Sequence, residues 1–382
     1  MSPPNGGRAR EVRTAFAAAH VVMRPSYAEV DHAPDRPGRP DEIAPHIDWD
    51  ATLDQRRHLI RHGLGVAEAM DTAQRNELDW EVAAELIRRT SELGEGFVAG
   101  ASADHAGTIG SAAELAEAVA WQAGEIVRAG GVPIVMAQPW LVRAGLGPDA
   151  FVAFYADVVD RVDGELLIHW LGPMFLPALE GYFPGDSFDR VMDLDPEKVR
   201  GCKISLLDPE LERRVRERIV PREQFVLTGD DHHFADLIVG DDPAIDGWTS
   251  LAGRPLALGR FSHALLGVLD GIAAPARAAL DLLADGDVDE ARDRLAALEH
   301  VGRVAFEPPT RFYKAGLAFL AWVNGRQEAF LLPNHLERTR DLDHLRRLFD
   351  AARAAGAIDD AAAAAERLRA LEAGGQGEST TS

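Results

Sequence analysis

The chain has 382 residues and a formal net charge of −22 at pH 7, with 62 acidic and 40 basic side chains. A surface with this much negative charge repels nucleic acid and anionic lipid. We therefore expect no nucleic-acid partner and no membrane partner. Cys202 is the only cysteine, which excludes an intrachain disulfide and a cysteine-based zinc site. We see neither a signal peptide nor a membrane span, and we expect a cytoplasmic protein.

Short apolar segments alternate with amphipathic helical patterns, such as 80–93 and 111–130, through the first two thirds of the chain. Apolar segments separated by single helices are typical of parallel strands with right-handed crossovers. Eight strands are predicted, at 15–23, 65–70, 97–102, 132–139, 165–170, 199–205, 224–231 and 245–253. Eight such strands indicate a closed (β/α)8 TIM barrel. An open doubly wound sheet is the alternative, but no glycine-rich phosphate loop follows the first strand.

The composition divides the chain into four regions. We expect disordered tails at 1–11 and 374–382, the barrel at 12–258 and a C-terminal helical extension at 259–373. The helices predicted there are 260–285, 286–304, 310–325, 342–356 and 359–373. The loop at 24–49 is rich in proline and charge, which predicts a lid or a disordered segment after the first strand.

Polar residues lie at or after the ends of the predicted strands, where the active sites of (β/α)8 barrels are found. Lys203 and His169 are the candidate catalytic residues. The candidate substrate-binding residues are His20, Glu68, Asp71, Gln138, Asp230 and Ser250. Structural alternatives exist for several of them, because strand-end histidines are often only hydrogen-bonded and Asp71 could cap a helix.

Lys203 is one of only three lysines in the chain, beside 37 arginines, yet it stands inside the apolar stretch "VRGCKISLL". Successive side chains of a strand point to opposite faces, so Cys202 and Ile204 should face the helices and Lys203 the barrel interior. The small Gly201 below it would leave room. Desolvation lowers the pKa of a buried lysine, and a neutral amine can attack a carbonyl to form a Schiff base. The alternative is an ion pair with Glu68 or Asp230.

The stretch "GDDHH" at 229–233 supports a different interpretation. Its carboxylates and imidazoles, with His20, Glu68 and His169 on other strand ends, could bind a divalent metal ion. A bound metal ion would polarise a carbonyl without any lysine. Helix capping by the aspartates is the structural alternative. His169 could transfer protons in either kind of site, because the pKa of an unperturbed histidine lies near neutrality.

Three segments resemble the dihydrodipicolinate synthase / N-acetylneuraminate lyase superfamily, and more narrowly an uncharacterised dihydrodipicolinate synthase-like branch of it. They are "VRGCKISLLD", "LTGDDHHFADLIVGDDPAIDGWTSLAGRPL" and "GDVDEARDRLAALEHVGRVAFEPPTRFYKAGLAFL". The resemblance covers roughly residues 15–330. It implies a (β/α)8 barrel, a homo-oligomer, and the Schiff-base lysine of a class I aldolase at Lys203.

The sequence departs from the family pattern at the substrate-binding positions. The fifth strand ends in "IHWLGP", so His169 stands where the family has its proton-shuttling tyrosine. The next segment, "MFLPALEGYFPG", lacks the arginine that holds the substrate carboxylate, and "GVAEAMDT" replaces the Gly-x-x-Gly-Glu motif of the second strand. These departures favour a sugar-derived carbonyl compound over pyruvate.

Together these features predict a class I lyase that makes or breaks a bond next to a carbonyl of a small, sugar-derived keto compound. No cofactor is required for that chemistry, because the imine is the electron sink. A metal-assisted isomerase, epimerase or lyase on the same barrel is one alternative. A non-catalytic barrel that binds a metabolite is the other.

Overall fold

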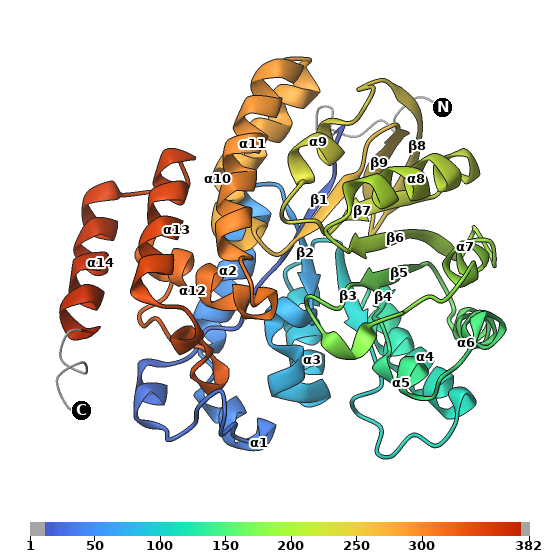
Figure 1. Cartoon of the computed structure of the whole chain (residues 1–382), viewed down its shortest axis with the longest axis horizontal. Coiled ribbons are helices and arrows are strands. Elements are labelled where there is room, and N and C mark those ends of the chain that lie inside the picture. Colours follow the sequence, from blue (N-terminus) through green and yellow to red (C-terminus); the bar gives the residue numbers. More distant parts are fainter. Residues whose placement is uncertain (1–11, 376–382) are drawn as a thin grey trace.

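In the computed structural model, which describes residues 12–375, eight parallel strands close into a barrel (Figure 1). Seven of them follow one another around the barrel in chain order, and the eighth lies between the seventh and the first. The barrel strands are β1 (Ala15–Ala18), β2 (Gly65–Glu68), β3 (Phe97–Ala101), β4 (Val132–Val135), β5 (Leu166–Leu171), β6 (Val199–Ser205), β7 (Phe225–Thr228) and β10 (His263–Leu266). The predicted (β/α)8 TIM barrel is confirmed.

The prediction of the eighth strand at 245–253 is wrong. That segment forms β8 (Ile245–Leu251), which pairs antiparallel with β9 (Arg254–Gly259) outside the barrel. The two turn residues, Ala252 and Gly253, both have positive φ, which is the geometry of a tight two-residue hairpin turn. The strand that closes the barrel, β10, begins at residue 263, so the barrel continues past the predicted boundary at 258.

The β8–β9 hairpin covers the N-terminal end of the barrel. The Arg254 guanidinium donates hydrogen bonds to the carbonyls of Gly63, at 3.0 Å, and Leu64, at 3.4 Å, just before β2. Three buried leucines of the hairpin, Leu251, Leu256 and Leu258, pack with the side chains that fill the barrel interior. The N-terminal end of the barrel is therefore closed by apolar packing.

Helices surround the barrel, and their starts are marked in the sequence. The side chains of Asp48, Ser111, Asp208 and Asp341 each accept a hydrogen bond from a backbone N–H of the first turn of a helix. The helices before β10 are α1 (Pro40–Ile43), α2 (Trp49–Arg61), α3 (Arg75–Ser91), α4 (Ala112–Arg128), α5 (Pro139–Arg143), α6 (Pro148–Arg161), α7 (Ser187–Met192), α8 (Pro209–Ile219) and α9 (Phe234–Val239). Across residues 12–375, none of the helices has both the length and the apolar character needed to cross a membrane.

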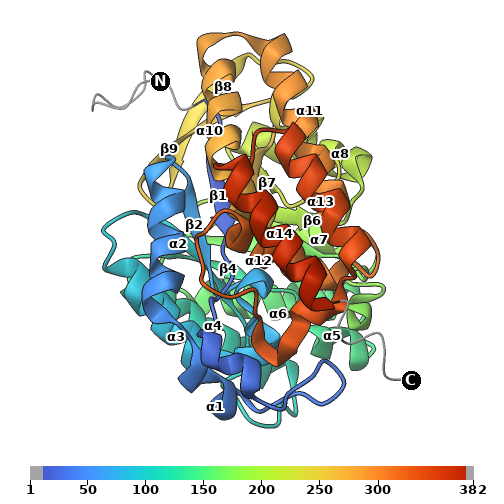
Figure 2. The same ribbon diagram turned by 90° about the vertical axis from the view of Figure 1, so that its left-hand side faces the viewer.

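The chain after β10 is helical, as predicted, and lies on one flank of the barrel. Figure 1 and Figure 2 show α12, α13 and α14 stacked outward from α10 and α11. These helices are α10 (Leu269–Asp285), α11 (Val288–Ala305), α12 (Tyr313–Val323), α13 (Leu342–Ala354) and α14 (Ala361–Gly375). Because α14 extends to Gly375, residues 374–375 of the predicted tail are helical. The predicted tail at 1–11 and the rest of the tail at 374–382 lie outside the described residues.

The segment at 24–49 is folded, so the alternative of a disordered loop is wrong, while a lid stays a prediction. The Tyr27 side chain is fully buried and its ring stacks on that of His335, with 4.9 Å between the ring centroids. Its hydroxyl accepts a hydrogen bond from the backbone N–H of Asn334 at 2.9 Å. The C-terminal extension thus holds this segment against the barrel.

The short 3-10 helices of the chain are η1 (Pro25–Glu29), η2 (Ala44–His46), η3 (Asp71–Ala73), η4 (Pro177–Leu179), η5 (Val220–Arg222), η6 (Thr310–Phe312) and η7 (Pro333–Thr339).

Candidate active site

Strand alternation orients the central side chains of the candidate site. Cys202 and Ile204 of β6 point outward, where they pack in the core between strands and helices. Lys203 and Ser205 therefore point into the barrel, as expected for alternate residues of a strand. In the register of β5 with β6, His169 lies beside Lys203 and Leu171 beside Ser205. The two candidate catalytic side chains are thus neighbours at the C-terminal ends of adjacent strands.

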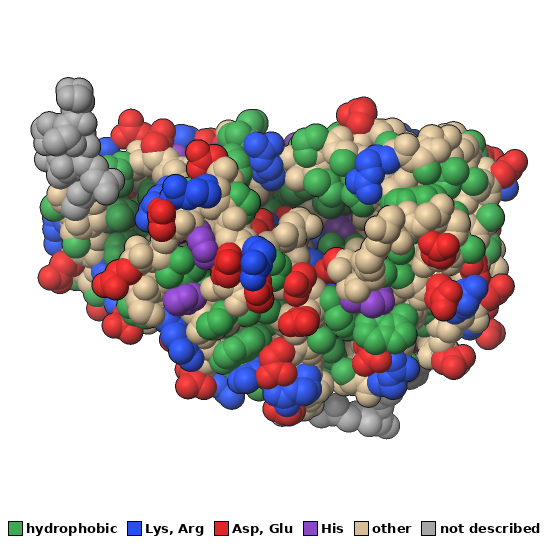
Figure 3. Space-filling view, turned by 90° about the horizontal axis from the view of Figure 1, so that it is seen from below, with side chains coloured by type: hydrophobic (Ala, Val, Ile, Leu, Met, Phe, Trp, Pro, Cys, Tyr) green, Lys and Arg blue, Asp and Glu red, His purple; other side chains and the backbone are tan. Residues whose placement is uncertain are grey.

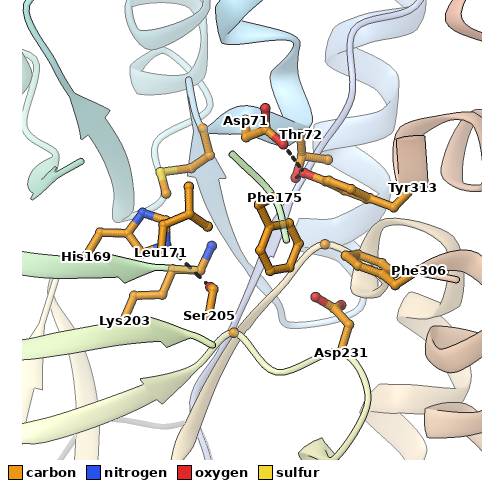
Figure 4. Close-up of a pocket in the computed structure, with 13 residues that line it drawn as sticks. Asp71, Thr72, His169, Leu171, Phe175, Lys203, Ser205, Asp231, Phe306 and Tyr313 are labelled. Atoms are coloured by element: carbon orange, nitrogen blue, oxygen red, sulfur yellow. Dashed lines mark hydrogen bonds between the residues drawn. The ribbon is translucent and has the colours of Figure 1, made fainter. Parts of the chain in front are cut away.

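These side chains line a small cavity at the C-terminal end of the barrel, with about 350 Å³ of empty space between its walls (Figure 4). The walls come from five barrel strands or the loops after them, and from the C-terminal extension. The lining residues are Met70, Asp71, Thr72, His169, Leu171, Phe175, Lys203, Ser205, Gly229, Asp231, Gly267, Phe306 and Tyr313. Lys203 is the only lysine or arginine among them.

The space for the Lys203 side chain comes from a glycine directly after the next strand, β7. A Cβ atom at Gly229 would lie 2.8 Å from Cε of Lys203 and 2.2 Å from Oγ of Ser205, so no other residue fits there unchanged. The sequence analysis gave this role to Gly201, where a Cβ atom would instead meet the carbonyl oxygen of Phe225 at 2.2 Å. That expectation is corrected, because Gly201 is needed for the close approach of β6 to β7.

The surroundings of Lys203 favour the neutral form of its amine, compared with a lysine exposed to water. Burial lowers the pKa of Lys203 below its ordinary value, and the negative charges of Asp231 and Asp71 oppose only part of that effect. Burial also raises the pKa of Asp231, whose Oδ1 atom accepts a hydrogen bond from the Val268 backbone N–H at 2.9 Å. Figure 4 shows the lysine ammonium facing the cavity with no hydrogen bond to the residues drawn.

His169 is a neutral imidazole in this setting. Burial lowers its pKa well below the usual value, and the charge of Lys203 lowers it further. Its Nε2 atom lies 3.3 Å from the Ser205 hydroxyl, while its buried Nδ1 atom has no hydrogen-bond partner among the described residues. One ring nitrogen is therefore without a partner among the described residues. The sequence analysis expected an unperturbed histidine, so its pKa is lower than predicted.

The opposite wall of the cavity contains side chains that the sequence analysis missed. The Tyr313 hydroxyl donates a hydrogen bond to Oδ2 of Asp71 at 3.0 Å and lies 2.8 Å from the hydroxyl of Thr72. The buried Lys314 ammonium donates to Oδ1 of Asp71 at 2.9 Å. The Tyr313 ring stacks on Phe306, with centroids 4.3 Å apart. The only sequence signal was the stretch "EPPTRFYK", which holds one of the three lysines.

Of the six predicted substrate-binding residues, Asp71 lies at this cavity and the other five lie elsewhere. His20 is fully buried between Asp270 and Gln327, 2.5 Å from Oδ2 of the first and 2.7 Å from Oε1 of the second. Glu68 points to the helix side of β2. There its carboxylate accepts two hydrogen bonds from Arg56, at 2.8 and 2.9 Å.

The three remaining residues either form hydrogen bonds within the protein or lie far from the cavity. The Gln138 side chain donates a hydrogen bond to the Met136 carbonyl at 2.8 Å. The Asp230 carboxylate accepts from the backbone N–H groups of His232 and His233, at 2.9 and 3.0 Å, so it caps the turn after β7. Ser250 is on β8, at the closed N-terminal end of the barrel. We propose no substrate contact for these five residues.

The residues that suggested a metal site do not converge. Within residues 12–375, no three side chains of histidine, cysteine, aspartate or glutamate come together in the way that metal ligands do. The reason is again strand alternation, because Asp231 faces the cavity whereas Asp230 and Glu68 face away from it. The donor set therefore favours the lysine interpretation over the metal-assisted alternative.

Comparison with solved structures places the fold among the dihydrodipicolinate synthases. The dihydrodipicolinate synthase of Thermotoga maritima is similar, with a TM-score of 0.59 at 12% identity, covering 90% of this chain and 100% of that one. The chloride-inhibited enzyme of Acinetobacter baumannii complexed with pyruvate has a TM-score of 0.59, 12% identity, and coverage of 91% and 100%. That of Bacteroides thetaiotaomicron has a TM-score of 0.58, 13% identity, and coverage of 91% and 99%.

This protein is thus a (β/α)8 barrel whose fold is similar to that of the dihydrodipicolinate synthases. Within that fold class, the chain belongs to the family described as "Protein of unknown function (DUF993)", whose pattern matches residues 3–375. A search of curated protein sequences gives no match.

Proposed function

We propose that this protein is a class I lyase in which Lys203 forms a Schiff base with a small, sugar-derived carbonyl compound. The observation that carries the proposal is the position of Lys203, buried at the C-terminal end of the barrel with its ammonium facing a cavity. Its lowered pKa increases the neutral fraction that can act as a nucleophile. The dihydrodipicolinate synthase fold of the chain supports the same general chemistry.

The reaction begins when Nζ of neutral Lys203 attacks the carbonyl carbon of the substrate. Proton transfer from nitrogen to oxygen gives a neutral carbinolamine, and a further proton, donated by the Asp231 carboxyl, lets the hydroxyl leave as water and an iminium ion form. The bond between the α and β carbons then breaks, its electron pair moves toward the iminium nitrogen, and an enamine forms. The β-hydroxyl loses its proton as the departing part becomes an aldehyde. Protonation of the α carbon and hydrolysis return the lysine. Elimination of a β-hydroxyl, with cleavage of a C–O bond, would use the same electron sink.

Two side chains beside Lys203 supply the proton transfers. We assign His169 the transfers to and from the substrate, because it lines the cavity beside Lys203 and its buried Nδ1 atom has no hydrogen-bond partner among the described residues. Asp231 has a raised pKa, so its carboxyl holds a proton at higher pH than an exposed aspartate does. It can exchange that proton with the amine of Lys203 as the carbinolamine forms.

The lining of the cavity supports a sugar-derived substrate rather than pyruvate. One of the similar structures is described as complexed with pyruvate. In the present cavity, Lys203 is the only cation among the lining residues, and its positive charge passes to the iminium nitrogen at the reacting carbon. The lining holds no arginine and no second lysine to bind a substrate carboxylate, because the nearby Lys314 ammonium is already bound to Asp71.

Reductive trapping tests the proposal directly. Purified protein is incubated with a panel of ketoses and keto acids in the presence of borohydride, and intact and peptide masses are then measured. We expect a stable adduct on Lys203, whose mass identifies the carbonyl compound. The matched control is Lys198→Arg, because Lys198 lies outside the cavity with its ammonium on the Val159 carbonyl at 2.9 Å. That variant should trap as well as the natural protein.

An adduct that maps to Lys198 or Lys314 instead of Lys203 would contradict the proposal. Ligand binding without any trapped adduct would favour the non-catalytic barrel, and activity that depends on an added divalent metal ion would favour the metal-assisted alternative. The homo-oligomer and the cytoplasmic location stay predictions, which size-exclusion chromatography with light scattering and cell fractionation would test.

A further inference from the structure

A second, larger cavity adjoins the one that contains Lys203. It has about 810 Å³ of empty space, which includes open solvent at its mouth, and shares three wall residues, Asp71, Leu171 and Phe175, with the first cavity. A ligand joined to Lys203 that extends past Asp71 would enter this second cavity. The chemistry of its walls therefore describes the part of the substrate that lies away from the carbonyl.

One wall of the second cavity is polar and mostly acidic. It contains an amide, a hydroxyl, three carboxylates and one guanidinium, from Asn76, Ser102, Asp71, Asp79, Asp104 and Arg75. The Asp104 side chain is 29% exposed and borders this space. Burial opposes its ionisation, but the hydrogen bonds and charge of Arg75 hold the pKa of Asp104 below its ordinary value. This wall thus presents ionised oxygen acceptors to a ligand.

The one cation of that wall is not available to a substrate anion. Arg75 is buried, and its Nε and Nη2 atoms donate to both carboxylate oxygens of Asp104, at 2.6 and 2.8 Å. Nη2 also donates to Oε1 of Gln122 at 2.7 Å. Nη1 donates to the carbonyls of Ala69 and Gly100, both at 3.2 Å. All five N–H groups of the guanidinium therefore have acceptors within the protein.

The other lining residues are apolar. They are Met136, Ala137, Pro139, Leu171, Phe175 and Leu176, from the end of β5, the start of α5 and the loops after β4 and β5. A cavity with one wall of hydrogen-bond acceptors and one apolar wall fits a chain that has hydroxyl groups on one side and C–H groups on the other. Acidic side chains also gather beside the hollow in the middle of the face shown in Figure 3.

From these walls we infer that the second cavity receives an uncharged, hydroxyl-bearing chain, and that substrates with a carboxylate or phosphate on that part are rejected. Four carboxylates line the two cavities, and no described cation in or beside their walls is free to bind an anion on that part of the substrate: Arg75 is saturated, Lys314 is bound to Asp71, and the charge of Lys203 stays at the iminium nitrogen. An anion there would therefore lie near carboxylates without a partner of opposite charge. The inference rests on the proposed function, which supplies the attachment at Lys203.

Matched pairs of carbonyl compounds test this selectivity. Hydroxyacetone and pyruvate have the same length and differ in a hydroxymethyl group against a carboxylate. Xylulose and its terminal phosphate ester differ by the phosphate group at the far end, which adds negative charge together with bulk. Borohydride trapping rates with the natural protein should favour the neutral member of each pair by about tenfold or more, given the cost of like-charge contact. Trapping rates for the anionic members that equal or exceed the neutral ones would overturn the inference and leave the lysine chemistry intact.

A second measurement separates the inference from the proposed function. The midpoint of thermal unfolding is followed with each compound in the absence of borohydride, because a ligand that binds only the folded state raises it. If nothing is trapped on Lys203 but xylulose raises the midpoint more than its phosphate ester does, the cavity assignment stands and the Schiff-base proposal fails. A midpoint raised equally or more by the phosphate ester would contradict the assignment of the cavity.

A pair of charge-neutralising variants on α3 locates the selectivity. Asp79→Asn removes one carboxylate of the polar wall with little change of shape, so it should narrow the preference for xylulose over its phosphate ester severalfold. Glu81→Gln makes the same charge change on an exposed side chain of the same helix that does not line the cavity. It should leave the preference unchanged. Equal narrowing in both variants would show a general charge effect instead of recognition by this wall.

Discussion

The two ends of the barrel are filled in opposite ways by the same eight strands. At the N-terminal end, the β8–β9 hairpin inserts Leu251, Leu256 and Leu258 against the apolar interior. At the C-terminal end, inward positions of β5 and β6 carry His169 and Lys203, and Gly229 on the loop after β7 leaves space beside them. One end maximises apolar packing and the other keeps polar groups buried beside empty space. The comparison indicates that the stability of this barrel and its chemistry depend on separate residue sets.

The largest effect on activity is expected from Lys203→Arg at the C-terminal end of the barrel. An arginine stays protonated and cannot form an imine, so turnover and borohydride trapping should fall to background. Steady-state rates and adduct mass measure both. Circular dichroism should show an unchanged fold, and retained turnover in a correctly folded Lys203→Arg protein would refute the lysine mechanism.

His169→Phe should lower turnover by roughly 10²–10⁴-fold, the usual contribution of a general acid or base. Trapping of the imine should fall much less, since Lys203 remains in place. Comparing turnover with single-turnover trapping separates the two steps. Equal loss of both would assign His169 to the packing around Lys203 rather than to proton transfer.

Leu256→Ala tests the closed end. Removing this fully buried side chain should cost about 2–5 kcal/mol of unfolding free energy through lost burial and a new cavity. Urea denaturation measures the loss, with the exposed Ser250→Ala on the same hairpin as the control. Trapping per folded molecule should not change. A selective loss of trapping in Leu256→Ala would break the separation between the two ends.

The pH dependence of imine formation should report the environment of Lys203. Because the neutral amine is the nucleophile, the trapping rate should rise with pH through the lowered pKa of Lys203 and level off below the ordinary lysine value. Asp231 raises that pKa, so Asp231→Asn should move the midpoint to lower pH by about one pH unit. Cyanoborohydride trapping rates measure the midpoint. The exposed Asp236→Asn is the control, and a shift to higher pH in Asp231→Asn would contradict the electrostatic account.

Tyr313→Phe should have the smallest effect. It removes the hydrogen bonds to Thr72 and Asp71, each typically worth about 1 kcal/mol net, and leaves the stacking on Phe306 in place. Urea denaturation should show a loss of that order, with trapping on Lys203 retained. A loss of trapping as complete as in Lys203→Arg would place Tyr313 among the reacting groups.

The sequence was sufficient where the signal was local and periodic. Apolar segments located seven of the eight barrel strands, and alternation within "VRGCKIS" predicted the inward direction of Lys203. The eighth strand was misplaced because residues 245–253 do contain a strand, β8, but it pairs with β9 in a hairpin instead of closing the barrel. Only the neighbouring strand with which each strand pairs distinguishes β8 from β10, and that pairing depends on the tertiary structure.

The candidate site was predictable only in part for the same reason. Alternation applied to every strand end would have favoured Asp231 over Asp230, since Thr228 and Asp230 face away from the cavity and Asp231 faces it. No local pattern could place Tyr313 against Asp71, because the two are separated by 242 residues and meet only through the packing of the extension. Nor could the sequence show that the acceptors around Arg75 saturate it.

The contribution of Phe306 and Tyr313 to the wall of the cavity has an evolutionary consequence. Both rings lie at the junction of α11 and α12, outside the strands that bear Lys203 and His169. Mutations in that junction can change which carbonyl compounds fit while the reacting groups and the eight-stranded scaffold stay as they are. Proteins that descend from one ancestral barrel could thus diverge in substrate through changes in a short helical connection, while the reacting groups stay the same.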